Sequence, residues 1–593
     1  LASHTESVAE RGAGTPMCAA VVVQSAGDLM AGGVRTPLRS GAGLLTVNGG
    51  VVSMALVCRA RRSVSCEPKL ATTIAECPAE WPVELPAASF QPPTAQVLSL
   101  VPPPPLSSGN VVSIGARRYL LHSPLGSGTY SCVWLARVAS VGWETEADGA
   151  AEVAIKEMKC GRGPGILPDA TLQRTHYEVQ VMQQLAAEAA RSSGSSTLCA
   201  PRILDHQFWP LGPEAPEALL CRVAMTRCRG QPLCEWTEAC RWRGEGWAQS
   251  AARSASFVAA AGSAAAVPEV LSQHEATAAY CTSFLAAALA ARALLVQLGP
   301  TFQTLNGSIA MHRDVNARNL LVFSPDPTFP ISLCNSAAPT VSMAAEALEF
   351  SVVDFGACVD AAAWVGNGEG SWQAANPTGD ARYWGPASWA RHLEGPDALR
   401  GDAALLRQYT RRLDMFAVAV CALEAMAALH TAECPSTPSS NGGELVEGVE
   451  RLRRGWTGYW ELAVHSFDLL SAYSHHACAG DDATAGQVWN GLLQANVPQA
   501  LRDCIGELCA NLSAAAEHLR RAPPAPEAAV AQWRQAADTL SALREMLLPE
   551  GRLEWADLPA VLSSSVSVAP PLGGSAEVCF CAIDEDPHDV SVA

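Results

Sequence analysis

Two short stretches in the middle of the chain constrain its fold more than any other feature. Residues 311–319 read M-H-R-D-V-N-A-R-N, and residues 354–356 read D-F-G. Short motifs recur by chance, so neither stretch would be informative alone. Here both follow a glycine-rich turn at residues 126–133, G-S-G-T-Y-S-C-V, and the V-A-I-K sequence at residues 153–156. The order of the four motifs restricts the fold far more than any one of them.

Together the four motifs resemble those of the eukaryotic protein kinase superfamily, in which H-R-D-x-x-x-x-N is the catalytic loop and D-F-G binds metal. The resemblance covers residues 112–550. It implies an α+β, bilobal protein-kinase-like fold with a small β-rich N-lobe and a larger helical C-lobe. It also implies an enzyme that uses ATP and Mg²⁺ to transfer the γ-phosphate to a hydroxyl group of a protein substrate, on serine or threonine rather than tyrosine.

The hydrophobic pattern gives an independent division of the chain. Strands are expected where apolar residues alternate or run together, at residues 118–125, 132–138, 152–159, 202–208 and 218–226. An amphipathic helix is expected at residues 171–190. Later helices are expected at residues 231–242, 277–298 and 409–429, with several more up to residue 548. A strand-rich part therefore precedes a helix-rich part.

Composition distinguishes the segments that lie outside or interrupt the kinase-like domain. Residues 1–110 are expected to be a disordered or targeting N-terminal region that ends in a proline run. Between Asp28 and Glu67 this region contains arginines but no acidic residue, as organelle transit peptides do. Low-complexity stretches predict insertions in the kinase-like domain near residues 242–270, 324–347 and 431–450, and residues 551–593 are expected to form a C-terminal tail.

Charge and cysteine content exclude some classes of protein. The net charge of −18 argues against a nucleic-acid partner, which would need a basic face. The 21 cysteines show no zinc-ligand spacing, which favours reduced thiols in an intracellular protein over a disulfide framework. No integral membrane segment is expected, because the apolar stretches at residues 284–298 and 415–429 are shorter than a bilayer span of about 20 residues. The cytoplasm is the default compartment, with a plastid or mitochondrion as the alternative.

The resemblance places nucleotide contacts in the strand-rich part. Glycine lets a backbone approach phosphate oxygens and direct N–H groups at them, although Ser131 replaces the third glycine of the family loop. The ATP-binding residues that the resemblance implies are Gly126, Ser127, Gly128, Val133, Ala154, Lys156, Met225 and Cys228. In the family the V-A-I-K lysine neutralises phosphates and is held by a glutamate on the next helix. Glu178 is the expected partner of Lys156.

The resemblance also assigns the chemistry. Asp314 is expected to orient the acceptor hydroxyl and accept its proton, and Asn319 and Asp354 are expected to bind Mg²⁺. Carboxylate and amide oxygens are hard ligands of the kind that Mg²⁺ prefers. Residues 413–418 resemble the start of the buried central helix of the large lobe, where an aspartate, here Asp414, holds the catalytic-loop backbone.

Four positions depart from the family pattern. Asn316 stands at the usual lysine position, and Arg318 gives an arrangement seen in tyrosine kinases. Asp380 stands where serine/threonine kinases carry threonine, and Ala387 replaces a structural glutamate, which is expected to loosen the helical part. We hypothesise that Arg318, taken as a further catalytic residue, forms an ion pair with Asp380 that orders the substrate segment.

Arg313 precedes the catalytic aspartate, and in the family this arginine can bind a phosphate on the activation segment. The hydroxyl groups between residues 357 and 384 belong to Ser371, Thr378 and Tyr383. We expect an upstream activating kinase to phosphorylate Ser371 or Thr378.

Two other functions stay open at this point. A pseudokinase-type scaffold would bind ATP or partners without efficient catalysis, and the altered substrate segment is its best support. The retention of Lys156, Asp314, Asn319 and Asp354 argues against it. A small-molecule phosphotransferase on a related fold is the other alternative. The resemblance of residues 224–228 to the kinase hinge, of residues 379–387 to the end of the activation segment and of residues 413–418 to the central helix argues against that function.

Overall fold

The computed structural model of the chain describes residues 103–127, 131–139, 152–161, 172–191, 198–211, 218–240, 273–325, 347–366, 368, 370–430, 432, 434–435, 443–521 and 527–563. These residues form an α+β structure, with an antiparallel sheet first and mostly helices after it. The N-terminal region up to residue 102, the expected insertion at residues 242–270, most of the one at 324–347 and the tail beyond residue 563 lie outside the described residues.

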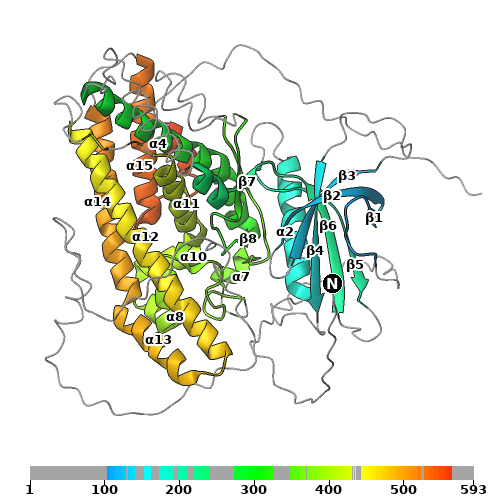
Figure 1. Ribbon diagram of the computed structural model, residues 1–593. Coiled ribbons are helices and arrows are strands. Elements are labelled where there is room, and N and C mark those ends of the chain that lie inside the picture. Colours follow the sequence, from blue (N-terminus) through cyan, green and yellow to red (C-terminus); the bar gives the residue numbers. More distant parts are fainter. Residues whose placement is uncertain are drawn as a thin grey trace, which may run out of the picture.

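Six antiparallel strands form one sheet in the order β1-β2-β3-β4-β6-β5 (Figure 1). Their bounds are β1 (Val111–Ile114), β2 (Arg117–Ser127), β3 (Ser131–Val138), β4 (Glu152–Gly161), β5 (Ile203–Pro210) and β6 (Ala218–Thr226). The strands predicted from apolar alternation are confirmed to within a few residues. Helix α2 (Leu172–Arg191), which matches the predicted amphipathic helix, packs against β4, β5 and β6.

The two faces of the sheet pack against different partners, because side chains alternate along a strand. Ile155 and Ala224 lie on one face, in a small core cluster with Tyr119. Ala154 and Met225 lie on the other face, in the large core cluster that continues through α2 into the helical part. One face of the sheet is therefore turned toward the helices.

Two short sheets connect the main sheet to the helices. One contains β7 (Gln231–Pro232), β9 (Leu320–Phe323) and β10 (Glu349–Val352), and the other pairs β8 (Ala310–Met311) with β11 (Val359–Asp360). β9 begins directly after Asn319, and β10 ends shortly before Asp354. Because β9 and β10 are antiparallel neighbours, the two central motifs of the sequence are brought together, and the expected insertion at residues 324–347 falls in the connection between them.

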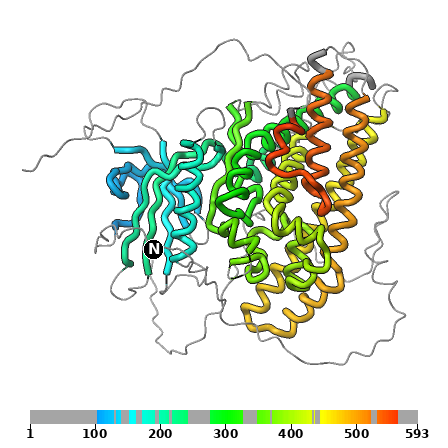
Figure 2. The backbone as a smooth tube through the Cα atoms, turned by 180° about the vertical axis from the view of Figure 1, so that it is seen from behind, coloured from blue at the N-terminus to red at the C-terminus, as the bar shows by residue number. Residues whose placement is uncertain are grey.

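The remaining helices form the larger part of the structure (Figures 1 and 2). Their bounds are α4 (Gln273–Thr304), α7 (Ala361–Val365), α8 (Pro386–Glu394), α9 (Pro396–Arg400), α10 (Ala403–Arg411), α11 (Leu413–Leu429), α12 (Gly443–Cys478), α13 (Asp482–Ala495), α14 (Val497–Arg521), α15 (Glu527–Leu547) and α16 (Leu558–Ser563), with the turns η1 (Leu305–Ile309) and η2 (Ala381–Tyr383). α11 is apolar nearly all round, as helices inside a core are. It packs against α4 and α15, while α14 packs between α12 and α15.

The structure corrects several predicted boundaries. The helix expected at residues 231–242 begins at residue 233, because Gln231 and Pro232 pair with β9 as strand β7. The helix expected at residues 409–429 is divided into α10 and α11 at Arg412. Residues 443–450, expected within an insertion, form the first turns of α12.

The beginning of the expected C-terminal tail, residues 551–563, packs on the helical part instead. Trp555 is 6% exposed, and its ring stacks on that of Phe302 with the centroids 5.2 Å apart. Its indole N–H donates to Oδ1 of Asn306 at 2.9 Å. The folded region therefore extends beyond residue 550.

Among the described residues, one helical stretch, Ala276–Ile309, which comprises most of α4 and the turn η1, is long and apolar enough to cross a membrane by length and composition, with a mean hydropathy of 1.7. It is longer than the apolar segment recognised in the sequence. In its most apolar window, 78% is buried inside the protein. A core helix of a folded domain has the same properties.

Candidate active site

Lys156 on β4 joins two carboxylates from distant parts of the chain. Its Nζ donates to Oε1 of Glu178 on α2 at 2.5 Å and to Oδ1 of Asp354 at 2.9 Å. The side chains of Lys156 and Glu178 are 9% and 5% exposed, whereas that of Asp354 is 50% exposed. The structure thus contains the expected Lys156–Glu178 ion pair and adds the aspartate of the D-F-G motif to it.

These three charges shift one another's protonation. Burial alone would lower the pKa of Lys156, but the carboxylates of Asp354 and Glu178 outweigh it and raise that pKa above its usual value. Burial raises the pKa of Glu178, and the ammonium group of Lys156 opposes this change. The same ammonium group lowers the pKa of Asp354. Lys156 and Asp354 are therefore charged at neutral pH, which binding of a phosphate and of a cation would require.

Most strand residues expected to bind ATP share the sheet face that carries Lys156. Gly126 lies opposite Val133, Val133 opposite Lys156, and Ala154 opposite Met225. Residues directly opposite each other in antiparallel strands point to the same face, and so do residues two apart on one strand. A nucleotide on this face would lie between the sheet and the helical part.

The other three residues expected to bind ATP are not assigned to this sheet face. Gly128 lies outside the described residues. Ser127 ends β2 and is exposed. Cys228 follows β6 close to Ser351 on β10, and burial raises the pKa of its thiol to about 11 while Ser351 opposes the change.

The catalytic-loop motif is held by a buried carboxylate of α11. Asp414, 1% exposed, accepts the backbone N–H groups of His312 at 2.7 Å and Arg313 at 2.8 Å, and the side-chain amide of Asn306 at 2.7 Å. Arg313 and Asp354 both have a φ of 66°, a conformation that residues other than glycine rarely adopt. Such strained backbone persists only where surrounding contacts impose it, and it concentrates at functional sites.

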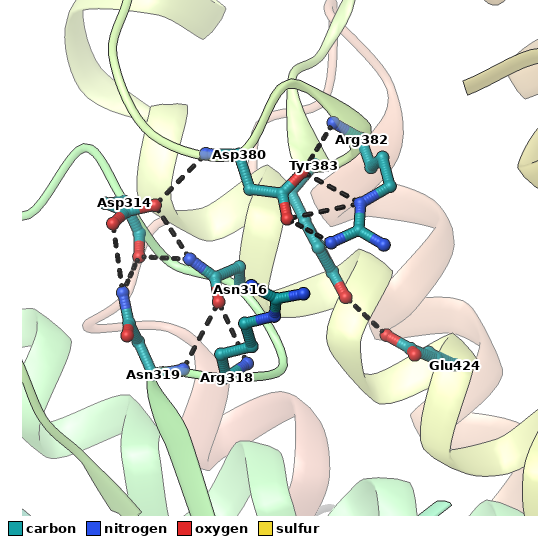
Figure 3. A network of polar contacts seen from close by, with 8 residues as sticks. All are labelled: Asp314, Asn316, Arg318, Asn319, Asp380, Arg382, Tyr383 and Glu424. Carbon is teal, nitrogen blue, oxygen red and sulfur yellow. Dashed lines mark hydrogen bonds and ion pairs between the residues drawn. The ribbon is translucent and has the colours of Figure 1, made fainter. Parts of the chain in front are cut away.

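Figure 3 shows the polar contacts around Asp314. Its Oδ1 accepts Nδ2 of Asn316 at 2.7 Å and the backbone N–H of Asp380 at 3.1 Å, and its Oδ2 accepts Nδ2 of Asn319 at 3.1 Å. Burial and the nearby carboxylate of Asp354 raise the pKa of Asp314 to about 6, although His312 and the hydrogen bonds from Asp380 and Asn316 oppose the increase. Three uncharged N–H groups therefore fix the orientation of this carboxylate.

Gly379 allows the segment that carries Asp380 to approach Asp314 this closely. It has a φ of +85°, and a Cβ atom there would lie 2.6 Å from Oδ1 of Asp314 and 2.8 Å from the carbonyl oxygen of Arg313. Only glycine combines this conformation with the absence of a side chain. The backbone N–H of Asp380 can consequently reach the Asp314 carboxylate.

The structure pairs Asp380 with a different arginine from the one that we hypothesised. Nε of Arg382 donates to the two carboxylate oxygens of Asp380 at 2.9 and 3.2 Å, and the Arg382 guanidinium forms an ion pair with the same carboxylate. Arg382 is only two residues from Asp380 on the turn η2, and its guanidinium lies 5.1 Å from the ring centroid of Phe467. Arg382 therefore forms an ion pair with the carboxylate that the sequence led us to pair with Arg318.

Two arginines hold the segment between residues 371 and 376 by its backbone. Arg391, 7% exposed, donates to three carbonyl oxygens at 3.4, 2.7 and 3.2 Å, and Nη2 of Arg313 donates to another at 2.6 Å. The acceptors are, in that order, the carbonyl oxygens of Trp372, Gln373, Ala375 and Asn376. Arg313 also lies 5.2 Å from the ring centroid of the buried Trp364. The arginine expected to bind a phosphate thus binds a backbone carbonyl in this conformation.

The two serine or threonine candidates for phosphorylation differ in accessibility. Ser371 is 2% exposed. Thr378 is partly exposed, and its carbonyl oxygen accepts the indole N–H of Trp384 at 2.9 Å. A phosphate on this segment would therefore fit Thr378 better than Ser371.

The side-chain amide of Gln408 links the backbone at Ala387, where the family pattern has a glutamate, to the end of α15. The N–H of Ala387 donates to Oε1 of Gln408 at 3.2 Å, and Nε2 of Gln408 donates to the carbonyl oxygen of Leu547 at the end of α15 at 3.4 Å. Nearby, the buried guanidinium of Arg412 donates to two carbonyl oxygens after α15, each at 2.8 Å. These contacts provide a connection to the late helices that does not depend on a glutamate at residue 387.

Asn319 and Asp354 have the donor chemistry for a magnesium ion. Asn319 turns its amide nitrogen to Asp314, which leaves its amide oxygen for another partner, and the N–H of Val353 donates to the Asn319 carbonyl at 2.9 Å. The described residues contain no group of three or more His, Cys, Asp and Glu side chains that could hold a metal. Mg²⁺ usually binds one or two protein ligands together with phosphates and water, so these two oxygen donors fit it.

Sequence reasoning missed the roles of Asn316, Arg382 and Gln408. Asn316 and Ala387 were recognised as departures from the family, but the replacement contacts come from backbone geometry that a motif does not contain. Gly379 offered one usable signal, because a glycine directly before a position that approaches the catalytic loop indicates close contact between backbones.

Comparisons with known proteins add little to this geometry. No family model and no curated protein sequence matches the chain. Among the solved structures that match is the crystal structure of the BubR1 kinase domain, at 10% sequence identity and a TM-score of 0.28. The match covers 66% of this chain and 89% of that one.

Proposed function

We propose that this chain is a protein kinase with a two-lobed, kinase-like fold that transfers the γ-phosphate of ATP to a hydroxyl group of a protein, on serine or threonine in preference to tyrosine. The proposal depends chiefly on Lys156, which bridges Glu178 and Asp354. The next support is Asp314, whose carboxylate is fixed close to Asn319. These five residues come from separate parts of the chain, and a structural role would not require all of them to meet.

Each of these side chains would have a separate role in the transfer. Lys156 would bind ATP phosphates on the sheet face that carries Val133 and Ala154, with Glu178 holding it in place. Asp314 would orient the acceptor hydroxyl and accept its proton as the acceptor oxygen bonds to the γ-phosphorus. The bond from that phosphorus to the β–γ bridging oxygen breaks, and ADP leaves.

Asn319 and Asp354 would hold Mg²⁺, which when bound neutralises the charge of the β- and γ-phosphate oxygens. The half-exposed carboxylate of Asp354 stays ionised because Lys156 lowers its pKa. Asp314, which lies beside these two residues, is the group that would receive the proton.

The test is transfer from γ-labelled ATP with Mg²⁺ to a mixture of protein substrates. We expect labelled phosphoprotein with the wild type and with Arg400→Ala, a change in an exposed ion pair. We expect none with Asp354→Asn. Acid hydrolysis of the product would distinguish phosphoserine and phosphothreonine from phosphotyrosine. Absence of transfer by the wild type would refute the proposal.

A scaffold that binds nucleotide without efficient transfer is the second candidate. The observation that favours it is that a neutral amide, Asn316 at the usual lysine position, donates to Oδ1 of Asp314. ATP binding that survives Asp354→Asn, together with no transfer by the wild type, would select this function instead.

A further inference from the structure

Asn316 is a buried amide in the centre of the catalytic-loop motif. It is 4% exposed. Its Nδ2 donates to Oδ1 of Asp314 at 2.7 Å and to the Asp314 carbonyl oxygen at 3.1 Å. Its Oδ1 accepts the backbone N–H groups of Arg318 at 2.9 Å and Asn319 at 3.2 Å. A side-chain amide has two donor hydrogens and two acceptor positions, and here all four are used.

These contacts have two separable effects. The donor half of the amide acts on the Asp314 side chain, and the acceptor half closes the turn that leads to Asn319 (Figure 3). Asn316 and the N–H of Asp380 together occupy both acceptor positions of Oδ1 on Asp314. Oδ2 accepts one donor, from Asn319, and keeps one position for a further partner.

We propose that Asn316 is a positioning residue for the phosphoryl transfer, which holds Oδ1 of Asp314 so that Oδ2 receives the acceptor hydroxyl. The inference rests on the proposed function, and it assigns the orientation of the base to a neutral amide. Asn316 contacts Asn319 through the backbone N–H and not through the amide oxygen that would hold Mg²⁺, and it contacts none of the residues that we assign to ATP, so its effect falls on the chemical step and not on nucleotide affinity.

Two substitutions separate the two halves of the amide. Asn316→Asp keeps oxygen acceptors for the N–H groups of Arg318 and Asn319, but it offers no donor to Asp314 and brings a second negative charge close to it. Asn316→Lys offers donors to Asp314 and no acceptor for the turn. A residue that only stabilised the turn would tolerate aspartate better than lysine, and a residue that positions Asp314 would do the reverse.

The experiment measures kcat, the KM for ATP and the melting temperature of both variants with Mg²⁺ and a protein substrate. We expect kcat to fall at least about 100-fold in Asn316→Asp and less than about tenfold in Asn316→Lys, because small misplacements of a catalytic group cost about that much. The KM for ATP should change less than about threefold. Asn306→Ala is the matched control, since Asn306 supports the same loop through Asp414, and it should lower the melting temperature with a kcat loss below about tenfold. Equal kcat losses in the two Asn316 variants, or a kcat within tenfold of wild type in Asn316→Asp, would overturn the proposal.

A second measurement separates this inference from the proposed function. If the wild type transfers no phosphate, the proposed function fails, but the Asn316–Asp314 contact can still be tested by NMR of the Asn316 side-chain amide. In Asp314→Ala its signal should move and its hydrogens should exchange faster with solvent. An unchanged signal would overturn the positioning role regardless of activity.

Discussion

Replacement of Lys156 by methionine should destabilise the protein by about 3–5 kcal/mol, because it leaves the buried carboxylate of Glu178 without its partner. At 2.5 Å, two unit charges attract each other by about 6–7 kcal/mol with an effective dielectric constant of about 20. Desolvation of the two groups offsets part of this attraction. The net destabilisation by Lys156→Met should still be large, because the Glu178 side chain is only 5% exposed and water cannot replace its partner.

The assay is urea denaturation at pH 7. Arg400→Met is the matched control, because Arg400 pairs with Asp397 where the two side chains are 55% and 84% exposed, and this change should cost less than about 1 kcal/mol. The double variant Lys156→Met/Glu178→Leu removes both buried charges and should recover most of the loss. The deficit of Lys156→Met should also shrink at pH 5, where the unpaired Glu178 takes up a proton. A cost below 1 kcal/mol for Lys156→Met would refute the reasoning.

The other predictions concern the activation segment, the helical part and the turn at Asp314. Gly379→Ala should lower kcat at least about 100-fold in a steady-state assay with little change in the KM for ATP, since its Cβ would meet Oδ1 of Asp314 at 2.6 Å; normal kcat would contradict the packing. Burial lowers the pKa of His392 to about 4, against about 6.5 in an unfolded chain, so stability present above pH 6.5 should be lost as the pH falls from 6.5 toward 4, by up to about 3 kcal/mol. Urea midpoints of wild type and His392→Phe at pH 7.5 and 5 check this, and parallel decreases in both proteins would exclude the histidine as the cause. Mass spectrometry after incubation with ATP and a cell lysate as the source of an upstream kinase should find phosphate on Thr378 and not on the buried Ser371; phosphate on Ser371 would contradict this prediction.

The strand and helix pattern could be predicted because it depends on local periodicity. The strands from residue 117 to residue 226 follow from apolar alternation, and α2 follows from its amphipathic face. The break between α10 and α11 could not be predicted, since the segment is continuously helical in pattern. It occurs at Arg412, whose guanidinium binds carbonyl oxygens more than a hundred residues away in sequence.

The candidate site, like the fold, could be predicted only in part. Lys156, Glu178 and Asp354 meet as the motif order implied, because each position is carried by a regular element or by the β9–β10 hairpin. The ion pair between Arg382 and Asp380 was not predicted, because which arginine reaches a carboxylate depends on the conformation of one turn. A contact between a backbone N–H and a side chain, such as that of Asp380 with Asp314, does not depend on the identity of the donating residue, and here the signal for it lay in the neighbouring Gly379.

The most direct test of the central claim is the single-turnover rate of phosphate transfer by the wild type and by Asp314→Asn, at saturating ATP and Mg²⁺. Asp314→Asn keeps the size of the side chain but cannot accept a proton, so the rate should fall by about 10²–10⁴-fold while nucleotide binding is retained. Equal rates for the two proteins, or no transfer by either one when ATP is bound, would contradict the assignment of Asp314 as the catalytic base of a protein kinase.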